Sequence, residues 1–550
     1  MLPSFASSLL RRLGTLSRRE LFRRGSFASL GGLLTPAAPS SAAVATGLQL
    51  GATPQAVYNS IGVRPLINCR GTLTVIGGSI EIPEVRAVKD LANQMHAPID
   101  EIMHAVGKRL AELTGAEWGM VSSGCAAAMS HATAACVAGG NPDLHVKIPN
   151  LAGFSKDEVI IPTTSRNVYD AAIRAIGVKI VEVDSVAALE SAIGPKTAMI
   201  YIFAGPRAEA GPPSFDDTVR IARQHNVPVF VDAAAEILTI PNIYLTRGAT
   251  LVGYSGGKYI RGPQSAGLML GRKDLVQAAW VHSAPHHGYG RSMKVGREEM
   301  LGMLMAVESW VKRDHAAEWK HWLARLDHIA RAVAAIPGVT TRVHEPTERS
   351  NRSPSLSIRW KADALHLTGQ QLSTLLDTTE PRIAVGGEGF RRPPAPGAAE
   401  TSISITAAMM ADGDERIVAR RLVELLSAKR DPKPVETPAP PAADLSGRWE
   451  AEITYAASSS RHLLFFDQKG SVLQGAHQGD FTTRDLVGSM NGAEVRFGSY
   501  VGEQHGEALS YRFSGTLAGH GTDASLSGTL DLGEYLTAQW TARRKPYGRA

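Results

Sequence analysis

Val229-Phe230-Val231-Asp232-Ala233-Ala234 and Tyr254-Ser255-Gly256-Gly257-Lys258 are the two stretches that decide the fold and indicate the chemistry. The first is an apolar strand that ends in a carboxylate, and the second is a short strand followed by two glycines and a lysine. In an α/β protein the carboxyl ends of parallel strands lie along one edge of the sheet, where ligands collect. We therefore expect Asp232 and Lys258 to lie in one site.

A lysine and a carboxylate in this arrangement match the needs of pyridoxal 5'-phosphate (PLP). The lysine binds the cofactor as a Schiff base, and the carboxylate keeps the pyridine nitrogen protonated so that the ring accepts electrons. Taken alone, each residue has an ordinary explanation, a solvated surface lysine or a helix-capping aspartate. The linked pair with its glycines favours a PLP site in which Lys258 and Asp232 are the catalytic residues.

A third stretch, Ser122-Ser123-Gly124-Cys125-Ala126-Ala127-Ala128, follows an expected strand and opens an expected helix. Small residues let backbone amides approach an anion, and a helix N-terminus favours negative charge. On its own this stretch is an ordinary helix cap, but with Asp232 and Lys258 downstream it predicts a cup for the PLP phosphate. The residues that we assign to cofactor binding on this basis are Ser123, Gly124, Cys125, Ala126 and Ser255.

Between about residues 61 and 428, short β-branched runs alternate with amphipathic stretches, which is the pattern of an α/β fold with a largely parallel sheet. The expected strands are Gly119–Ser122, Glu158–Pro162, Val178–Val183, Ala198–Phe203, Pro228–Val231, Leu251–Tyr254 and Ala266–Leu270. The expected helices are Glu84–Leu113, Ala126–Val137, Phe215–Gln224 and Arg297–Ile336. A smaller α+β lobe is predicted from strands Thr340–His344 and Ser355–Arg359 and helices Gln370–Leu376 and Asp414–Leu426.

Five prolines among residues 429–443 indicate a linker. The residues beyond it contain short alternating segments separated by glycines, which predicts an antiparallel β-barrel or sandwich. These segments are Arg448–Thr454, His462–Phe466, Val472–His477, Ala508–Ser514, Asp523–Leu530 and Leu536–Arg543, and Gly447-Arg448-Trp449 weakly resembles the opening of lipocalin-like barrels. The expected order is a signal (1–45), a lead-in with the PLP-binding domain (46–300), an α+β domain (301–428), the linker (429–443) and an all-β domain (444–550).

The net charge of +6 lies mostly at the front of the chain, because residues 1–45 hold six arginines and one glutamate. The near-neutral remainder gives no broad basic surface for nucleic acid or an anionic membrane. Ser17-Arg18-Arg19-Glu20-Leu21-Phe22, the apolar run Phe27–Leu34 and Ala43-Val44-Ala45 resemble a twin-arginine signal, which exports folded proteins. The alternatives are a disordered basic tail and a mitochondrial-type presequence. We expect a periplasmic or secreted protein without a membrane span, disulfide framework or metal site.

Six strings of residues, taken together, are specific to one group of proteins. They are Gly62-Val63-Arg64-Pro65-Leu66-Ile67-Asn68-Cys69-Arg70-Gly71-Thr72, Leu113-Thr114-Gly115-Ala116-Glu117, Ser123-Gly124-Cys125-Ala126-Ala127-Ala128, Ser255-Gly256-Gly257-Lys258, Arg261-Gly262-Pro263-Gln264 and Gly290-Arg291-Ser292-Met293-Lys294-Val295-Gly296-Arg297-Glu298-Glu299. Over about residues 56–428 the chain resembles the selenocysteine synthase-like branch of fold-type I PLP enzymes, which includes D-glucosaminate-6-phosphate ammonia-lyase-type proteins. The resemblance implies that Lys258 forms the Schiff base, that Asp232 holds the pyridine nitrogen, and that residues 124–126 bind the phosphate. It also implies a homodimer or larger homo-oligomer, since such sites generally borrow residues from a second subunit.

The sequence departs from this branch in the stretch Thr164-Ser165-Arg166-Asn167-Val168-Tyr169-Asp170, where lyase-type members often carry a histidine and this chain has none. Tyr169 is a candidate for stacking on the cofactor ring, and Arg166 and Asn167 are candidates for facing substrate. The transferase members have Asp where Gly257 stands and Arg where Lys294 stands, so these two positions favour the lyase side. Candidates for binding a substrate carboxylate or phosphate, each otherwise an ordinary surface cation, are Arg64, Arg70, Arg261, Arg291 and Lys294.

The sequence thus predicts a PLP-dependent lyase that acts on a small amino acid or amino sugar acid by α,β-elimination or β-replacement through Lys258. Racemisation and transamination share the first steps and stay open. Selenium transfer to seryl-tRNA is a second hypothesis, disfavoured by an export signal and by the near-neutral body. A third is an inactive PLP-fold protein whose C-terminal domain binds a ligand or partner.

Overall fold

The computed structural model describes residues 53–387, 400–431, 439–500 and 510–545. The expected signal at 1–45 lies outside these residues. Residues up to Pro65 form a separate unit, in which the structure describes one helix, α3 (Pro54–Asn59), and Leu66 begins the unit that contains the domains below. Within the described ranges, no helix is both long enough and apolar enough to cross a bilayer.

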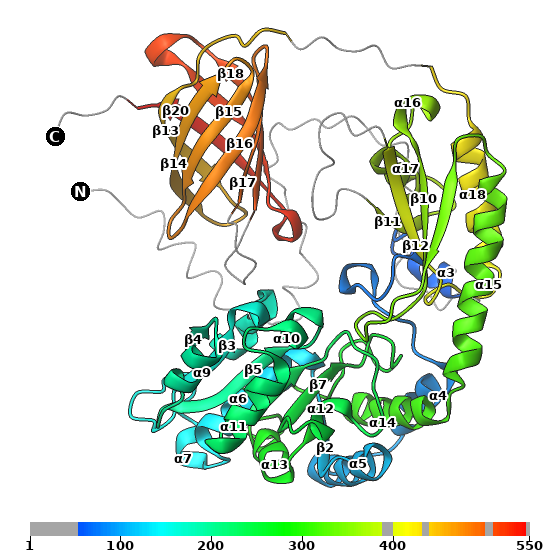
Figure 1. Cartoon of the computed structure of the whole chain (residues 1–550), viewed down its shortest axis with the longest axis vertical. Coiled ribbons are helices and arrows are strands. Elements are labelled where there is room, and N and C mark those ends of the chain that lie inside the picture. The colour runs from blue at the N-terminus through cyan, green and yellow to red at the C-terminus, as the bar shows by residue number, and fades with distance from the viewer. Residues whose placement is uncertain (1–52, 388–399, 432–438, 501–509, 546–550) are drawn as a thin grey trace, which may run out of the picture. The chain divides into compact units, whose positions relative to one another are not determined.

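A seven-stranded sheet with the strand order β2-β8-β7-β6-β5-β3-β4 forms the large domain (Figure 1). The strands are β2 (Trp118–Ser122), β3 (Glu158–Pro162), β4 (Lys179–Val183), β5 (Thr197–Phe203), β6 (Val229–Asp232), β7 (Leu251–Ser255) and β8 (Gly267–Gly271). Each expected strand is present, to within one residue at either end. The sheet is parallel apart from β8, which runs antiparallel to both of its neighbours.

The register of the sheet brings the ends of several strands to one edge. Asp232 at the end of β6 pairs with Phe203 of β5 and Gly253 of β7. Because β8 runs antiparallel, its first residue, Gly267, pairs with the last residues of both flanking strands, Ser122 and Ser255. One edge of the sheet therefore holds the ends of β2, β6 and β7 together with the start of β8.

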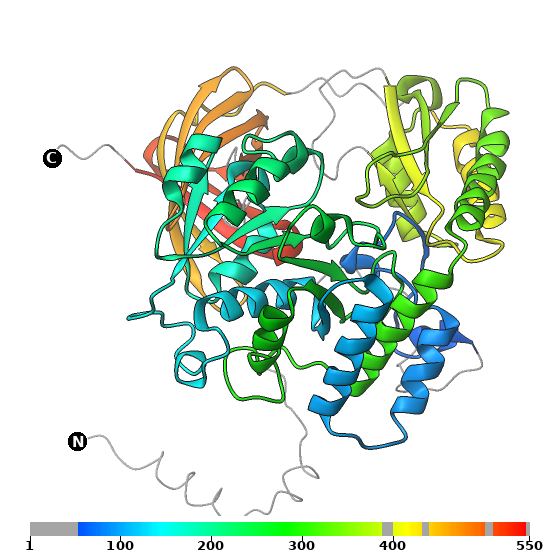
Figure 2. The same ribbon diagram turned by 60° about the horizontal axis from the view of Figure 1, so that its bottom comes forward.

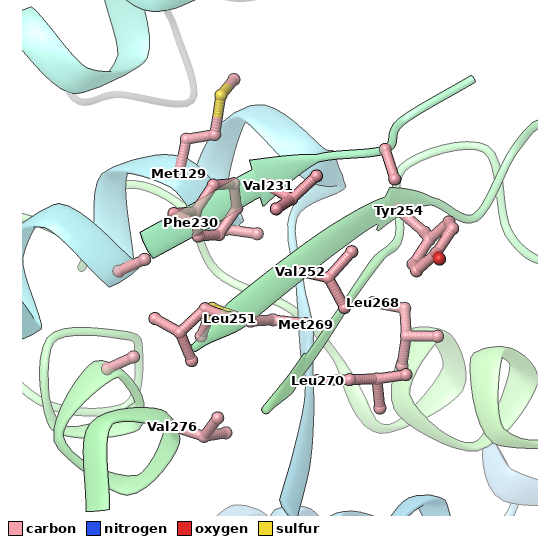
Figure 3. Packing of buried hydrophobic residues seen from close by; sticks show 14 of the residues in the cluster. Met129, Phe230, Val231, Leu251, Val252, Tyr254, Leu268, Met269, Leu270 and Val276 are labelled. Carbon is pink, nitrogen blue, oxygen red and sulfur yellow. The ribbon is translucent and has the colours of Figure 1, made fainter. Parts of the chain in front are cut away.

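The central strands are buried on both faces, which explains why they read as continuous apolar runs rather than as alternating ones. Val229–Asp232 is buried throughout, and Leu251–Tyr254 likewise. Figure 3 shows Met129 of helix α6 next to Phe230 of β6, with Val252 of β7 and Leu268 of β8 on the neighbouring strands. This core fixes the strand ends that carry the candidate residues.

The helices of the large domain cover the sheet and its edge. They are α4 (Pro83–Ala92), α5 (Ile99–Thr114), α6 (Gly124–Ala138), α7 (Pro142–His145), α8 (Ala171–Arg174), α9 (Val186–Ala192), α10 (Pro206–Ala210), α11 (Phe215–Gln224), α12 (Ile243–Thr246), α13 (Lys273–Val281) and α14 (Arg297–Lys312). Helix α14 packs against both α4 and α5, as Figure 2 shows.

Two helices that were expected to be continuous are each divided into two. Glu84–Leu113 is divided, because α4 ends at Ala92 and α5 begins only at Ile99, after Pro98, which lacks an amide hydrogen and disfavours a helical conformation in the residue before it. Arg297–Ile336 is divided into α14 and α15 (His315–Ala334), because Asp314 caps the second helix by accepting a 2.9 Å hydrogen bond from the Ala317 amide. The apolar periodicity of the sequence continues across both breaks, so it did not reveal where one helix ends and the next begins.

The small domain is built on a five-stranded sheet of order β1-β11-β12-β10-β9. Its strands are β1 (Ile67–Cys69), β9 (Thr340–His344), β10 (Ser355–Lys361), β11 (Ile383–Gly387) and β12 (Glu400–Thr406), and its helices are α15, α16 (Ala362–Leu365), α17 (Gly369–Thr378) and α18 (Asp414–Ser427). Strand β1 pairs in parallel with β11. The sequence analysis placed these lead-in residues with the large domain, and the difference arises because sequence order does not reveal a long-range strand pairing.

Eight strands, the first starting at Gly447 and the last ending at Arg544, form a closed antiparallel barrel, so the all-β prediction is confirmed in its barrel form. Its strands are β13 (Gly447–Thr454), β14 (Ser459–Lys469), β15 (Val472–Gln478), β16 (Thr483–Asn491), β17 (Glu494–Tyr500), β18 (Tyr511–Ala518), β19 (Ser525–Asp531) and β20 (Thr537–Arg544). Sequence reasoning missed β16 and β17, although the Asn491-Gly492 pair, where β16 ends and the two-residue connection begins, is a hairpin signal. Aliphatic and aromatic side chains fill the interior, with Phe497 stacked on Phe513 at 4.5 Å between centroids.

Candidate active site

Lys258 lies three residues beyond β7, in a turn that backbone hydrogen bonds close. The Arg261 amide donates to the Lys258 carbonyl at 2.9 Å, and the Gly256 amide donates to the Ala266 carbonyl at 2.8 Å. A Cβ on Gly257 would lie 2.7 Å from the Gln264 Cα. Glycine is therefore needed beside the lysine because the two arms of the turn approach closely.

The predicted phosphate cup lies at the start of α6, on the same edge of the sheet. Gly124 has φ +78°, and a side chain added there would meet no atom within 4 Å. The first amides of a helix have no acceptor within it, so they face an open space that suits an anion. Behind the cup, a Cβ on Gly267 would lie 2.3 Å from the Gly124 carbonyl carbon, so β8 supports the backbone of the cup directly.

Asp232 is 2% exposed and accepts hydrogen bonds on both carboxylate oxygens. Oδ2 accepts from the Tyr201 hydroxyl at 2.9 Å, while Oδ1 accepts from the Ala234 amide at 3.1 Å and the Cys125 thiol at 3.5 Å. Burial raises the pKa of Asp232, and these three donors and the nearby charge of Lys258 act in the opposite direction. The carboxylate therefore depends on its donors to keep its charge.

The donors to Asp232 are themselves held in the protonated form that they need. Burial raises the pKa of both the Tyr201 hydroxyl and the Cys125 thiol well above the ordinary values, and the neighbouring carboxylate raises them further. Asn167 Nδ2 donates to Tyr201 Oη at 3.0 Å and so leaves the hydroxyl proton for Asp232. The result is a buried chain of donors that ends on the carboxylate.

A cavity of about 410 Å³ surrounds Lys258. Its lining comes from the segment before α4, from α4 itself and from both arms of the lysine turn. The lining residues are Thr72, Thr74, Glu81, Lys89, Ser255, Gly257, Lys258, Pro263, Gln264 and Ser265. The cavity can admit a small polar molecule next to the lysine amine.

Several known proteins are similar to this chain in sequence and in fold. A family model described as Cys/Met metabolism PLP-dependent enzyme matches residues 99–293. D-glucosaminate-6-phosphate ammonia lyase of Salmonella typhimurium is 29% identical over 390 residues, which cover 68% of this chain and 99% of the relative. The solved structure of a D-glucosaminate-6-phosphate ammonia-lyase superposes with a TM-score of 0.60 at 28% identity, covering 67% of this chain and 98% of that chain.

Two further relatives extend the comparison. A 5'-C-glycyluridine monooxygenase-decarboxylase of Streptomyces sp. is 33% identical over 299 residues, covering 52% of this chain and 73% of the relative. The chain belongs to the fold-type I PLP-dependent enzymes. An L-seryl-tRNA(Sec) selenium transferase of Moorella thermoacetica is 24% identical over 304 residues, covering 48% of this chain and 59% of the relative. The resemblance inferred from the sequence is thus confirmed, and the chain is a PLP-dependent enzyme rather than a fold without a cofactor.

The residues present fit the cofactor of a fold-type I PLP-dependent enzyme. Lys258 offers the amine, Asp232 a buried carboxylate, and the start of α6 a cradle whose space a Cβ on Gly124 would enter. Ser123 precedes this helix and makes no side-chain capping bond, Ala126 lies in its first turn, and Ser255 lines the cavity. In the described part of the chain, no group of three or more His, Cys, Asp or Glu side chains could hold a metal ion.

The predicted substrate cations do not all gather around Lys258. Arg291 and Lys294 line a second cavity of about 590 Å³ that shares Ser265 with the first. Arg261 adopts φ +60° and its Nε donates to the Ile80 carbonyl at 3.0 Å, so it fastens the segment before α4 to the lysine turn. Arg70 is partly buried and lines neither cavity.

In residues 164–170, where lyase-type members often carry a histidine, the candidate side chains lie in different environments. Arg166 Nε donates to Asp170 at 2.6 Å, and its guanidinium also pairs with Glu182, while a contact of Arg166 with substrate stays a prediction. Asn167 bonds to Tyr201 and so acts on Asp232 from behind. Tyr169 is 56% exposed, and its stacking on the cofactor ring stays a prediction.

Sequence reasoning missed several residues of this site. Tyr201 reads as one more apolar position within β5, and only the register of the sheet places its hydroxyl on Asp232. Glu81 and Lys89 lie far from Lys258 in sequence and join it through folding. The one available signal was the unusual polarity of Tyr201 within a fully buried strand, since buried hydroxyls require partners.

We expect Tyr201→Phe to weaken PLP binding about 10- to 100-fold, the range for losing a hydrogen bond to a buried charged group. The Tyr201 hydroxyl lowers the pKa of Asp232 and burial raises it, so removal of the hydroxyl raises this pKa further. As the solution is acidified, Asp232 then loses its charge at a higher pH. The acid limit of PLP binding should therefore shift to higher pH. Titration of the apoprotein with PLP at several pH values measures both effects.

Tyr254→Phe is the matched control for this variant. Tyr254 is a buried tyrosine on β7, which flanks β6 on the side opposite β5, and its hydroxyl bonds to Asn242 instead of Asp232. Its loss should lower stability by a similar amount and leave the PLP titration unchanged. Equal weakening in the two variants would show that Tyr201 acts only through packing.

Proposed function

We propose that this fold-type I PLP-dependent enzyme is a lyase that removes a β-substituent from a small amino acid or amino sugar acid by α,β-elimination. The observation that carries the proposal is the match to 99% of the length of D-glucosaminate-6-phosphate ammonia lyase, with Lys258 and Asp232 inside the matched region. The cavity of about 410 Å³ beside Lys258 is large enough for a substrate of this class. β-Replacement by a second nucleophile uses the same site and the same first steps.

The roles of the residues follow from their positions. PLP, when bound, supplies an electron sink that stabilises the charge left on the substrate α-carbon after a proton is removed. Lys258 Nζ takes that α-proton, and Asp232 holds a negative charge in a dry environment, where it acts strongly on a protonated pyridine nitrogen. The first-turn amides of α6 bind the cofactor phosphate and fix its orientation.

A product assay tests the proposal. D-glucosaminate 6-phosphate, D-glucosaminate and a panel of β-hydroxy amino acids are each incubated with the PLP-loaded protein, and ammonia and 2-keto acid are measured. The proposal predicts equal amounts of both products from at least one compound. Bound PLP without either product from any compound would contradict it.

A second candidate reaction has support from one relative. The 33% identity to a 5'-C-glycyluridine monooxygenase-decarboxylase favours oxidative loss of the carboxylate from an amino acid at the same site. Elimination consumes no oxygen, whereas a monooxygenase does. Lyase turnover that is unchanged without oxygen supports the first candidate, and oxygen uptake matched by CO₂ release supports the second.

We infer that the active enzyme is a homodimer or a larger homo-oligomer. The segment that supplies cavity residues before and within α4 also exposes large apolar side chains, which are Leu73, Val75, Ile80, Leu91 and Met95. Several exposed large apolar side chains within one segment favour a protein interface. A second copy that covered it would also close the Lys258 cavity from solvent.

Val75→Asp is expected to dissociate the oligomer, because Val75 is 81% exposed and a charge there opposes burial in an interface. Light scattering coupled to size exclusion measures the mass. The expected result is a monomer with reduced PLP affinity. An unchanged mass would place the interface elsewhere, and Val472→Asp, an exposed barrel position, is the control.

We also propose that the enzyme is exported through the twin-arginine pathway. The support is the sequence of residues 1–45, with Arg18-Arg19 followed by an apolar run and a small-residue cleavage pattern. Arg18→Lys together with Arg19→Lys should retain the protein in the cytoplasm. N-terminal sequencing of the exported form should begin after Ala45.

A further inference from the structure

The cavity around Lys258 contains a second pair of ionisable side chains. Lys89 Nζ donates to Glu81 Oε1 at 2.5 Å, and the two side chains are only 26% and 19% exposed. Both line the cavity together with Lys258. Among the described residues of this lining, these three are the ones that carry charge, and the others are threonine, serine, glutamine, glycine and proline.

The pair is fixed in position relative to Lys258. The Ser79 amide donates to the Gly257 carbonyl at 3.0 Å, and the Ile82 amide donates to the Arg261 carbonyl at 3.4 Å. These two bonds tie the segment that carries Glu81 to the two ends of the lysine turn.

Lys89 is held by packing along its aliphatic stem. A Cβ on Gly302 of α14 would lie 2.9 Å from both Lys89 Cγ and Pro263 Cγ. Glycine at this point therefore lets α14 approach the stem closely, and the proline belongs to the arm of the turn that follows Lys258. The ammonium end is directed at Glu81 rather than left free to swing in solvent.

We propose that Lys89 is the acid that protonates the leaving group of the elimination, and that Glu81 is the residue that positions it. This inference rests on the proposed function. A lysine ammonium carries three donor hydrogens and no acceptor, whereas an ionised carboxylate only accepts. Within the pair, Lys89 is therefore the partner with a proton to give.

The step balances without any further reactant. Lys258 Nζ takes the proton from the substrate α-carbon, and the electron pair of that bond ends in the new Cα=Cβ bond. The Cβ–O bond breaks with its electron pair on oxygen, Lys89 Nζ gives a proton to this oxygen, and water leaves. Lys89 is then neutral and Lys258 is protonated, and exchange with solvent restores both.

The test compares two leaving groups in Lys89→Met. The probes are D-glucosaminate 6-phosphate and its analogue with chloride in place of the β-hydroxyl group, because chloride leaves without a proton. With the hydroxyl substrate, kcat should fall about 10²- to 10⁴-fold, the usual contribution of a general acid. With the chloro substrate, kcat should stay within about fivefold of the unmodified enzyme.

Three further variants sharpen the result. Lys89→Arg keeps the positive charge but holds its proton too tightly to give it up, so it should be as impaired as Lys89→Met with the hydroxyl substrate. Glu81→Gln should lower kcat with little change in KM, and Glu81→Asp should recover part of it. Lys179→Met is the control, because it removes an ion pair of the same type, 3.0 Å between Lys179 Nζ and Glu158 Oε1, on the protein surface.

Two measurements separate this inference from the proposed function. The visible absorption of bound PLP should be unchanged in every variant of the pair, and the substrate α-proton should still exchange with D₂O, since Lys258 is intact. Equal losses of kcat with both leaving groups, or loss of α-proton exchange in Lys89→Met, would overturn the role of Lys89 as the acid. Either result would leave the proposed function standing. Absence of α-proton exchange in the unmodified enzyme with every compound of the substrate panel would instead overturn the proposed function.

Discussion

Lys258→Ala is expected to lose at least about 10⁴-fold in kcat, because one side chain both binds the cofactor and moves the α-proton. Lys258 lies at the Asp232 edge of the sheet and lines the cavity of about 410 Å³. Its removal also leaves PLP held mainly through the phosphate cup. The ammonia and 2-keto acid assay, combined with α-proton exchange in D₂O, measures the loss.

A surface lysine provides the comparison for this variant. Lys196 is 63% exposed, and its Nζ lies 3.6 Å from Asp157 Oδ2. It does not line the Lys258 cavity. Lys196→Ala should retain full activity and PLP content. If Lys258→Ala kept more than about 1% of kcat, another group would have to be the base, and the assignment of Lys258 would be wrong.

Asp232→Asn is expected to lower kcat on the order of 10³-fold, as is typical when one strong electrostatic contact to a developing charge is removed from a dry site. Asparagine has the shape of aspartate and still accepts the Tyr201 hydrogen bond through its amide oxygen, but it carries no charge. The fold should therefore persist, whereas turnover falls and PLP binds more weakly without the Asp232 charge, so kcat is compared at saturating PLP. Steady-state kinetics on protein with a verified visible PLP band measures this directly.

The matched variant is Asp217→Asn on helix α11, where the carboxylate is exposed and bonds to Ser214 at the start of the helix. It removes one negative charge without touching the site, so kcat should not change. If Asp232→Asn also left kcat unchanged, the carboxylate would have a structural role only, and the pyridine nitrogen would not depend on it.

The sequence was most informative where strands are buried on both faces. Val229–Asp232 and Leu251–Ser255 are short, continuous and apolar, so their boundaries and their polar ends could be read directly. Because parallel strands align their carboxyl ends, the proximity of Asp232 and Lys258 also followed from the pattern. The placement of Asp232 and Lys258 at one edge of the sheet was thus predictable from local sequence and one general rule of topology.

Features that depend on long-range pairing were not predictable in this way. Strand β1 joins the small sheet through β11, more than 300 residues away in sequence. The Tyr201 hydroxyl reaches Asp232 only through the register of β5 on β6, and Lys89 reaches the lysine cavity only through the packing of α4 on α14. Neither contact leaves a periodic signal in the chain, since each depends on where two distant segments meet.

The central claim is that Lys258 binds PLP covalently, and borohydride reduction tests it most directly. The purified protein is loaded with PLP, its visible spectrum is recorded before and after reduction, and the modified residue is located by peptide mass spectrometry. The account predicts a visible band that disappears on reduction and a pyridoxyl group on the peptide that contains Lys258. Absence of the band after PLP addition, or a label on a different lysine, would contradict it.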